Sequence, residues 1–341
     1  MRKLINDPNN FVDEVMDGII RAYGDKVKLH EGDSRILLRA DEARPGKVGI
    51  VTGGGSGHLP VFLGYVGKGM LDGCAVGNVF ASPSAQKMAA MIKACDKGAG
   101  VLCLYGNYGG DNLNFDLACE TVEFDDVKTA TVRVADDVAS APKENAGKRR
   151  GVAGMVYAFK VAGASAERGD DLETVAANAR KALAATRTMG VALSPCIVPQ
   201  VGKPTFSIAD DEIEIGMGIH GEPGIEVRKM MSADEVAALV LGKILDDMPL
   251  ASGDKVSVMV NGLGATPLEE QLIVFRAVHK ILEAKGVEVF MPHIGEFATS
   301  MEMAGLSITV MKLDDELEAL FAAPASSQNS TTCLLYTSRR G

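Results

Sequence analysis

Two stretches of similar design decide the fold. Residues 47–52 (KVGIVT) form a short apolar run that continues directly into the glycine-rich residues 53–60 (GGGSGHLP). Residues 100–104 (GVLCL) lead in the same way into residues 106–115 (GNYGGDNLNF). A short apolar run bounded by glycines is typical of a buried strand, and α/β proteins bind ligands beyond the carboxyl ends of such strands. The sequence therefore predicts an α/β fold with sites built from loops.

Strand-like and helix-like segments alternate on both sides of these runs. We predict two α/β domains, each a central β-sheet flanked by helices, over residues 1–188 and 189–325. The first carries the glycine-rich loops. In the second, residues 296–304 (EFATSMEMA) are predicted to form a helix.

The second domain is also predicted to contain a β-ribbon. Asp210 and Asp211 mark a tight turn between the strand-like residues 205–209 and 212–218. Residues 326–341 follow the last helical pattern and read differently, because residues 333–338 (CLLYTS) resemble the translation of an adaptor used in sequencing libraries. We expect this tail to be non-native and exclude it from fold reasoning.

Composition limits the functional classes. Among 341 residues, 35 Lys and Arg against 45 Asp and Glu give a net charge of -10, which argues against a general nucleic-acid binder. No run of about 18 apolar residues is present to span a membrane, and the N-terminus has no apolar secretory signal. We therefore expect a cytoplasmic protein without a membrane or nucleic-acid partner.

The cysteines are expected to be small buried hydrophobic residues in a reducing compartment. None forms a CxxC pair, and their spacing fits neither a zinc site nor a disulfide framework. The six are Cys74, Cys95, Cys103, Cys119, Cys196 and Cys333.

The loop at residues 53–60 exposes backbone N–H groups through its glycines and ends on His58. It matches neither the P-loop pattern nor GxGxxG. Two interpretations stay open from spacing alone: a ligand-binding loop, or a tight turn in which His58 is a cap.

Asp111 and His220 are the other two candidates. Asp111 follows a strand and two glycines, so it could cap a helix that begins near Asn112 or accept a proton from a hydroxyl group. His220 lies in a bare glycine loop, residues 216–224 (GMGIHGEPG), with Glu222 nearby. A neutral imidazole there could be a base, a metal ligand or a nucleophile, but without HxH or HExxH spacing we predict no metal site.

Taken together, these motifs resemble one family, the K subunit of dihydroxyacetone (glycerone) kinase. The resemblance covers the chain in order to about residue 324. It is carried by KLIND (3–7), GGGSGH (53–58), VFASPSA (79–85), NYGGDNLNF (107–115), KRRGVAG (148–154), GIHGEPGIE (218–226), NGLGATPLEE (261–270) and GLSITVMKLDDEL (305–317).

The resemblance implies an enzyme subunit of glycerol metabolism, a phosphotransferase acting on an alcohol group. It implies two α/β domains and a homodimer. His220 would add to the carbonyl of a short-chain ketose as a hemiaminal, which is sensible for a neutral imidazole. Asp111 would be the general base, and His58 would hydrogen-bond the substrate and assist proton transfer. The family's ligand-contacting loop positions correspond to Gly55, Ser56, Gly57 and Gly106.

The resemblance also implies that nucleotide and metal are bound elsewhere. The chain shows no Walker motif and no kinase glycine-rich loop. An L-type partner subunit would therefore carry ATP and Mg²⁺, or ADP that acts in a phosphotransferase relay. The alternative from another class is a ketose-sensing co-regulator without catalysis.

Two departures from the family pattern bear on the substrate. Leu59 stands where the family has Glu, and Gly106 stands where it commonly has Lys; Gly109 replaces Thr. Losing two polar side chains would leave room at the site. We therefore expect dihydroxyacetone or a four-carbon ketose such as erythrulose as substrate.

Overall fold

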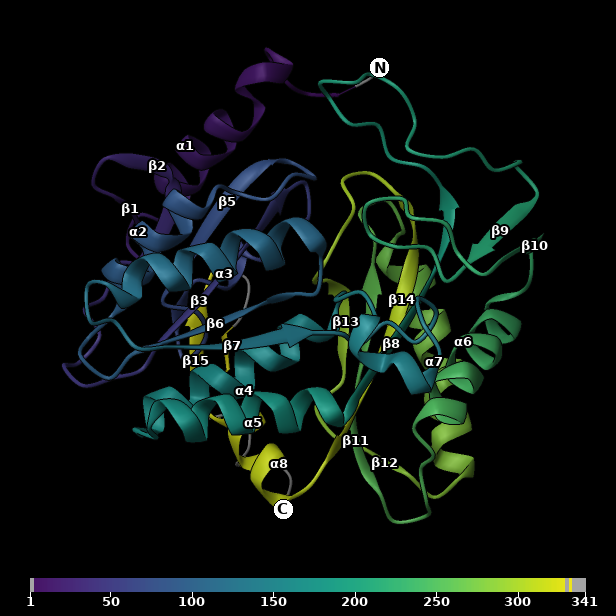
Figure 1. Cartoon of the computed structure of the whole chain (residues 1–341). Helices are drawn as coiled ribbons and strands as arrows, with labels where there is room; N and C mark the ends of the chain where they lie inside the picture. Colours follow the sequence, from purple (N-terminus) through teal and green to yellow (C-terminus); the bar gives the residue numbers. More distant parts are fainter. Residues whose placement is uncertain (1–2, 329–330, 333–341) are drawn as a thin grey trace.

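A computed structural model describes residues 3–328 and 331–332. Its strands form two large sheets and one small sheet (Figure 1). The first large sheet has the strand order β1-β2-β5-β3-β6-β7. These strands are β1 (Val27–His30), β2 (Asp33–Arg39), β3 (Gly49–Ser56), β5 (Gly73–Val79), β6 (Val101–Gly106) and β7 (Thr129–Val134).

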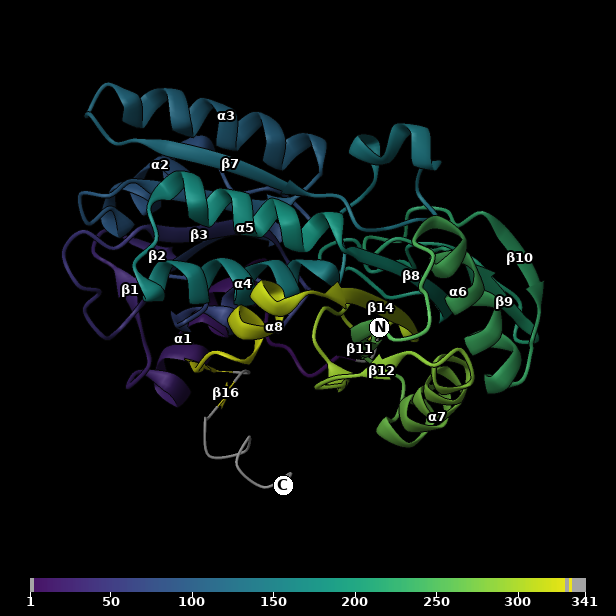
Figure 2. The same cartoon turned by 90° about the horizontal axis from the view of Figure 1, so that it is seen from below.

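Helices cover both faces of the first sheet (Figure 2). On one face α2 (Ala85–Cys95) packs beside α3 (Gly109–Glu123), and on the other α4 (Gly154–Arg168) packs beside α5 (Leu172–Ala184). Strands β5, β3, β6 and β7 run parallel, and every residue of β3 is buried. A parallel strand covered on both faces needs this continuous apolar or glycine sequence. Helix α1 (Phe11–Tyr23) packs beside β1 and β2.

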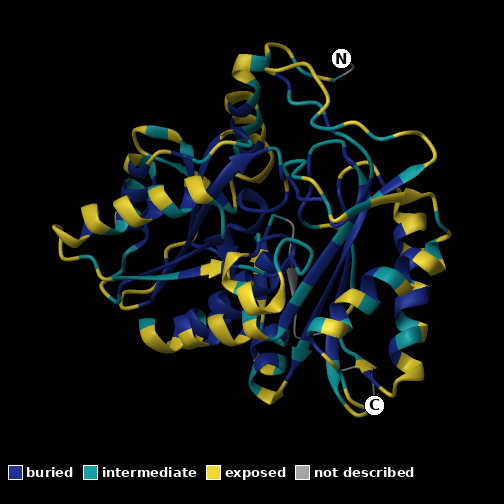
Figure 3. Cartoon of the chain, turned by 45° about the vertical axis from the view of Figure 1, so that its right-hand side comes forward, coloured by how far each residue is buried: buried dark blue, intermediate teal, exposed yellow. Residues whose placement is uncertain are grey.

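The second large sheet is mainly antiparallel, and β12 and β13 both pair in parallel with β11. Its strands, in chain order, are β8 (Thr186–Ser194), β9 (Glu212–Ile215), β10 (Glu226–Lys229), β11 (Lys255–Gly262), β12 (Glu288–Val289), β13 (His293–Glu296) and β14 (Ala304–Leu313). Helices α6 (Ala233–Asp247) and α7 (Leu268–Ala284) pack against each other beside this sheet. In Figure 3 the strands of both sheets are largely buried, while the outward faces of the helices are exposed. The predicted α/β class, with central sheets flanked by helices, is confirmed.

The end of the chain returns to the first half of the molecule. Helix α8 (Asp315–Ala322) contacts α4, and β15 (Ala325–Ser327) pairs with β4 (Gly67–Lys68) and with β16 (Thr331–Thr332). The predicted domain boundary between residues 188 and 189 falls within β8, and the predicted tail begins within β15. Residues 333–338 lie outside the described residues. Short 3-10 helices span Pro8–Asn10, Leu63–Tyr65 and Lys143–Lys148.

A β-ribbon is present, but it uses different strands from those expected. Residues 205–209 form no strand, and β9 pairs instead with β10. The Glu-Ile-Glu-Ile sequence of β9 explains its place, because Ile213 and Ile215 are buried in the core while the glutamates alternate outward. The loop between β9 and β10 is the one that carries His220.

The helix predicted at residues 296–304 is wrong. This segment follows β13 as irregular chain up to β14, because its backbone N–H groups bond to other segments instead of to carbonyls one turn back. The N–H groups of Phe297 and Ala298 donate to Asn261 Oδ1, each at 2.8 Å, and that of Met301 donates to the Gly57 carbonyl at 2.8 Å. The segment thereby lies directly against the glycine-rich loop that follows β3.

Candidate active site

Three loops from distant parts of the sequence form the candidate site. His58 follows the carboxyl end of β3, and Asp111 lies in the first turn of α3, just after β6. Because β3 and β6 are neighbouring parallel strands, both loops leave the sheet at the same edge. His220 comes from the β9–β10 loop of the second sheet, and its ring meets the His58 ring edge to face with centroids 4.7 Å apart.

His58 is held as a neutral imidazole with one defined tautomer. It is buried, and its Nδ1 lies 2.8 Å from the carbonyl oxygen of Thr299. A carbonyl only accepts, so Nδ1 carries the proton and Nε2 presents a lone pair. This buried Nε2 has no hydrogen-bond partner among the described residues. Burial, followed by the nearby His220, lowers the pKa of His58 to about 3.

Glu222 fixes the orientation of His220. Its Oε1 lies 2.8 Å from His220 Nδ1, and its Oε2 accepts the His220 backbone N–H at 3.0 Å. Burial alone would raise the pKa of Glu222, but the hydrogen bonds and charge interaction with His220 outweigh it and bring the pKa to about 2. An ionised carboxylate can only accept, so this hydrogen bond places a proton on Nδ1 of His220.

Two aromatic side chains enclose these imidazoles. Phe80 stacks on His58 with centroids 4.8 Å apart, and Tyr108 meets His220 edge to face at 4.7 Å. The Tyr108 hydroxyl donates to the Gly151 carbonyl at 2.9 Å, which fixes the ring. Residues 77–83, which include Phe80, could be expected from the sequence to line the same cleft as His58, whereas Tyr108 was not predicted as a site residue.

Asp111 is buried with an unsatisfied carboxyl oxygen. Its Oδ1 has no hydrogen-bond partner among the described residues. Burial raises its pKa to about 6, although a hydrogen bond with Ser82 and the nearby His220 act in the opposite direction. Helix α3 begins at Gly109 rather than near Asn112, and its N-cap residue is Tyr108, so Asp111 is not the N-cap.

The glycines of the first loop are needed for close packing. A Cβ atom on Gly55 would lie 2.7 Å from the Ala81 nitrogen and 2.8 Å from Phe80 Cα. Gly57 has a φ of +102°, a conformation that side chains other than glycine rarely adopt. Ser56 is buried, and its carbonyl accepts the Phe80 N–H at 3.0 Å. These residues therefore place Phe80 against His58.

Leu59 and Gly106, the two departures from the family pattern that were expected to leave room at the site, have different surroundings in the structure. The Leu59 side chain is exposed, and the residue's carbonyl accepts the Thr299 hydroxyl at 2.8 Å. At Gly106, by contrast, a Cβ atom would lie 3.1 Å from the Tyr108 ring and 3.3 Å from Met155 Sδ. The space beside Gly106 is thus filled by Tyr108, so this substitution does not open a void there.

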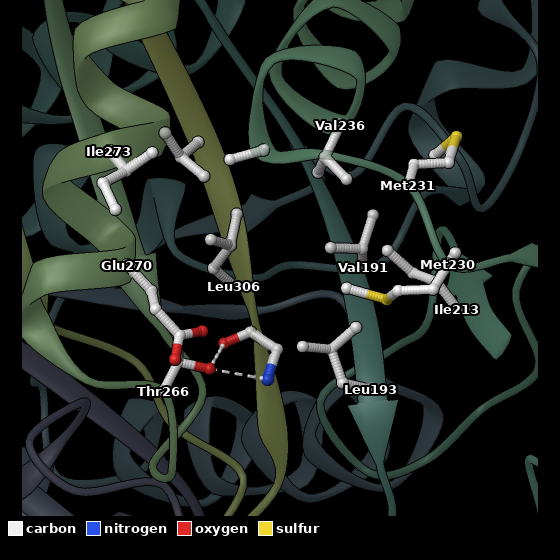
Figure 4. Close-up of a pocket in the computed structure, with 13 residues that line it drawn as sticks. Val191, Leu193, Ile213, Met230, Met231, Val236, Thr266, Glu270, Ile273 and Leu306 are labelled. Carbon is white, nitrogen blue, oxygen red and sulfur yellow. Dashed lines mark hydrogen bonds between the residues drawn. The ribbon is translucent and has the colours of Figure 1, made fainter. Parts of the chain in front are cut away.

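A separate apolar pocket lies on the second sheet (Figure 4). It has a volume of about 120 Å³, and none of the three candidate site residues lines it. Its walls come from β8, β14, α6, α7 and the chain that follows β10. In the described part of the chain, no three His, Cys, Asp or Glu side chains gather as metal ligands, and no helix is long and apolar enough to span a membrane.

The fold and site define a class: an α/β protein that places two imidazoles and a buried carboxyl group at the carboxyl edge of a parallel sheet. Residues 17–329 match the Dak1 domain. The chain belongs to the Dak1 domain family.

Among curated relatives, the chain is 46% identical to the dihydroxyacetone-binding subunit DhaK of a PTS-dependent dihydroxyacetone kinase of Listeria innocua, over 93% of this chain and 95% of the relative. It is 44% identical to D-erythrulose kinase of Mycolicibacterium smegmatis, over 95% of this chain but only 56% of that longer protein.

Two solved structures show the same fold. The dihydroxyacetone kinase of C. freundii, in complex with AMP-PNP and Mg²⁺, superposes with a TM-score of 0.90 at 33% identity, over 97% of this chain and 61% of that one. The dihydroxyacetone kinase operon co-activator DhaQ superposes with a TM-score of 0.86 at 30% identity, over 92% of this chain and 97% of that one.

Proposed function

We propose that this protein is the ketose-binding subunit of a dihydroxyacetone kinase. The carrying observation is the His220–Glu222 pair, in which Nδ1 bonds to a carboxylate at 2.8 Å and the imidazole ring lies against His58. The relative from Listeria innocua, whose name describes a dihydroxyacetone-binding subunit, supports the same substrate class. The reaction class is phosphoryl transfer to an alcohol group of a small ketose.

Capture would proceed by addition of His220 to the ketone. The Nε2 lone pair forms a bond to the carbonyl carbon, and the carbonyl π electrons move to oxygen, which takes up a proton. The imidazole becomes positively charged as the bond forms, and the ionised Glu222 at Nδ1 stabilises this charge. Loss of the Nδ1 proton through Glu222 then balances the proton that the oxygen takes up, and the product is the neutral hemiaminal.

Asp111 and His58 would both interact with hydroxyl groups of the substrate. With a pKa raised to about 6, Asp111 is ionised at neutral pH yet remains a better base than an ordinary carboxylate. The unpartnered Oδ1 would accept the proton of the hydroxyl that is phosphorylated. His58 would accept a substrate hydroxyl through Nε2, since its Nδ1 proton is committed to Thr299. Gly55, Ser56, Gly57 and Gly106 would form the surrounding ligand-contacting backbone.

We also propose that a partner subunit supplies the phosphoryl donor. An L-type subunit would bring ATP with Mg²⁺, or ADP that accepts phosphate from a phosphotransferase system. Two names support this division: the Listeria innocua relative is a binding subunit of a PTS-dependent kinase, and the longer C. freundii kinase was solved with AMP-PNP and Mg²⁺. A cytoplasmic location follows from the same proposal.

A homodimer is also proposed, and an exposed apolar face supports it. Met230, which follows β10, and Ile273 of α7 are exposed and line the pocket of Figure 4, and Val227 of β10 is exposed as well. Such a patch on a monomer indicates an interaction surface. Light scattering should give twice the chain mass for the wild type and for Val201→Lys, which changes an exposed loop residue, but the single-chain mass for Val227→Lys.

One assay decides between the kinase and the co-regulator, an alternative favoured by the likeness to DhaQ. The purified chain is mixed with an L-type subunit and its phosphoryl donor, and phosphorylated ketose is measured for dihydroxyacetone and erythrulose. The kinase proposal requires turnover that depends on this chain. Ketose binding without turnover, with every tested L-type subunit and donor, would assign the protein to the co-regulators.

A further inference from the structure

Two cysteines outside the candidate site lie in direct contact. Cys103 is on β6 and Cys119 is on α3, and their sulfur atoms are 3.8 Å apart. Cys103 is fully buried, whereas Cys119 is only half-buried. The contact modifies the expectation that every cysteine is an inert buried hydrophobic residue, because a buried and an accessible thiol here form a neighbouring pair.

The surroundings of the pair favour a thiolate on the accessible sulfur. Cys119 receives hydrogen bonds from Cys103, Thr129 and Thr131, and these outweigh burial and lower the pKa of its thiol. The same sulfur contact and burial raise the pKa of Cys103, so Cys103 remains protonated. Thr131 is the cross-strand partner of Cys103 on β7, an edge strand of the sheet. The hydroxyls and the buried thiol therefore converge on one half-exposed sulfur.

We infer that Cys103 and Cys119 form a redox-active dithiol that a hydroperoxide converts to an intramolecular disulfide. The Cys119 thiolate attacks the terminal peroxide oxygen, the O–O bond breaks, and Cys119 becomes a sulfenic acid, while the hydroxide or alkoxide that leaves takes a proton from solvent and becomes water or an alcohol. Cys103 then attacks the Cys119 sulfur, its proton passes to the departing hydroxyl, and water is released as the S–S bond forms. The dithiol loses two electrons, which the peroxide gains.

The geometry allows this step with little movement. A disulfide has sulfur atoms about 2.0 Å apart, so side-chain rotation and a small shift of α3 against β6 suffice. The bond would close a covalent ring through residues 103–119. This ring contains Gly106, Tyr108 and Asp111. Formation of the disulfide would therefore constrain the start of α3, the helix that carries Asp111.

Other cysteines provide matched controls. Cys74 is fully buried, and burial raises the pKa of its thiol. A thiol of this kind should react at least about tenfold more slowly with iodoacetamide at pH 7 than Cys119 does. Cys74→Ser also changes one buried thiol without touching the pair, so it separates loss of the pair from general loss of packing.

The test uses the full chain, treated with graded hydrogen peroxide, blocked with N-ethylmaleimide and digested without reductant for mass spectrometry. We expect a peptide linked through Cys103 and Cys119, which dithiothreitol cleaves. The linked peptide should persist in Cys74→Ser and disappear in both Cys119→Ser and Cys103→Ala, with circular dichroism confirming that each variant is folded.

Three results would overturn the inference. They are oxidation of Cys119 to sulfinic acid without any linked peptide, a disulfide that joins Cys119 to another cysteine or another chain, and a Cys119 that stays reduced while exposed methionines become oxidised. If Cys103→Ala does not fold, the wild-type peptide map and Cys119→Ser still decide the question.

Discussion

The rings of His58 and His220 meet at an interplanar angle of 90° with centroids 4.7 Å apart, and each ring has its Nδ1 committed to an acceptor. The Thr299 carbonyl holds His58, and Glu222 holds His220. In both rings Nε2 is therefore the nitrogen left for a substrate. Our proposal assigns His220 Nε2 to addition to the carbonyl and His58 Nε2 to accepting a hydrogen bond from a substrate hydroxyl.

The first prediction concerns covalent capture. Mixing the protein with excess dihydroxyacetone should add the mass of one ketose to the intact chain, because Glu222 occupies Nδ1 of His220 and leaves Nε2 to add to the carbonyl. His220→Ala should lose the adduct, and His279→Ala, a change on α7 away from the site, should retain it. Intact-protein mass spectrometry measures both. An adduct that survives in His220→Ala would remove His220 from its proposed role.

The second prediction concerns Glu222. Glu222→Gln keeps the size of the side chain but removes the negative charge that stabilises the imidazolium. We expect adduct formation to slow by about tenfold to a hundredfold, since a hydrogen bond to a charged group contributes about 1.5–3 kcal/mol. Mass spectrometry of samples quenched at successive times after mixing gives the rate of adduct formation. Glu226→Gln, which changes a partly exposed carboxylate of β10, should react at the wild-type rate; equal rates for both variants would contradict the assignment.

The third prediction concerns Asp111 in turnover. Asp111→Asn retains the shape but cannot accept a proton, so turnover with an L-type partner should fall by ~10²–10⁴-fold. Ketose binding should change much less. Wild-type turnover should also decline as pH falls through about 6, where Asp111 becomes protonated. Asp116→Asn, on the exposed side of the same helix, is the control. Near-normal turnover in Asp111→Asn would leave Asp111 without a catalytic role.

The fourth prediction is a stability effect of the same residue. Burial raises the pKa of Asp111 from 3.8 to about 6, so the folded protein holds this proton at pH values where the unfolded chain has released it. The free energy of unfolding should therefore decrease as pH rises from about 4 to about 6. Above that range Asp111→Asn should be more stable than wild type by roughly 1–3 kcal/mol. Urea unfolding at both ends of the range measures this; a variant that is less stable at pH 7.5 would contradict it.

The fifth prediction concerns the choice of ketose. Leu59 replaces a polar residue of the family, and a hydrogen bond to a neutral group contributes about 0.5–1.5 kcal/mol. Erythrulose should be used at least as well as dihydroxyacetone, judged by kcat/KM with the cognate partner. Leu59→Glu should shift the preference toward the triose. A wild-type preference for dihydroxyacetone of about a hundredfold would refute this expectation.

Adding Gly106→Lys to Leu59→Glu, so that both polar residues of the family pattern are restored, would give a poorer test. A Cβ atom at residue 106 would lie 3.1 Å from the Tyr108 ring, which in turn packs on His220. The double variant would disturb the ring that borders the proposed nucleophile. Leu59→Glu alone is the sharper test, since the Leu59 side chain is exposed and has room to change.

The sequence identified the loops because glycines after apolar runs report on backbone geometry. His58 and His220 were selected from such loops, and the structure brings them together. Their roles and that of Asp111 remain predictions. Thr299 could not have been found in the same way, because its contribution is a backbone carbonyl that any residue could provide. Its segment was expected to be helical, and only the contacts with Gly57 and Asn261 decide otherwise.

The same limit explains the other misjudgements. The ribbon was placed at the Asp210–Asp211 turn by local turn chemistry, but the pairing of β9 with β10 depends on which strands can bury Ile213 and Ile215. The cysteines were judged by spacing, which does not show that Cys119 on α3 reaches Cys103 on β6. Each of these features depends on contacts between residues that are far apart in the sequence, and a local sequence pattern does not show such contacts.

The contact between His58 and Thr299 also constrains the order of events during synthesis. The first sheet ends at β7, long before residue 299 leaves the ribosome. Until then the Nδ1 atom of His58 lacks the carbonyl that fixes its tautomer, and the loop lacks the segment that covers it. A nascent or truncated chain could thus form its first sheet and still possess no defined proton donor or acceptor at His58. The chemistry of this site therefore matures only after the chain has been made beyond residue 299.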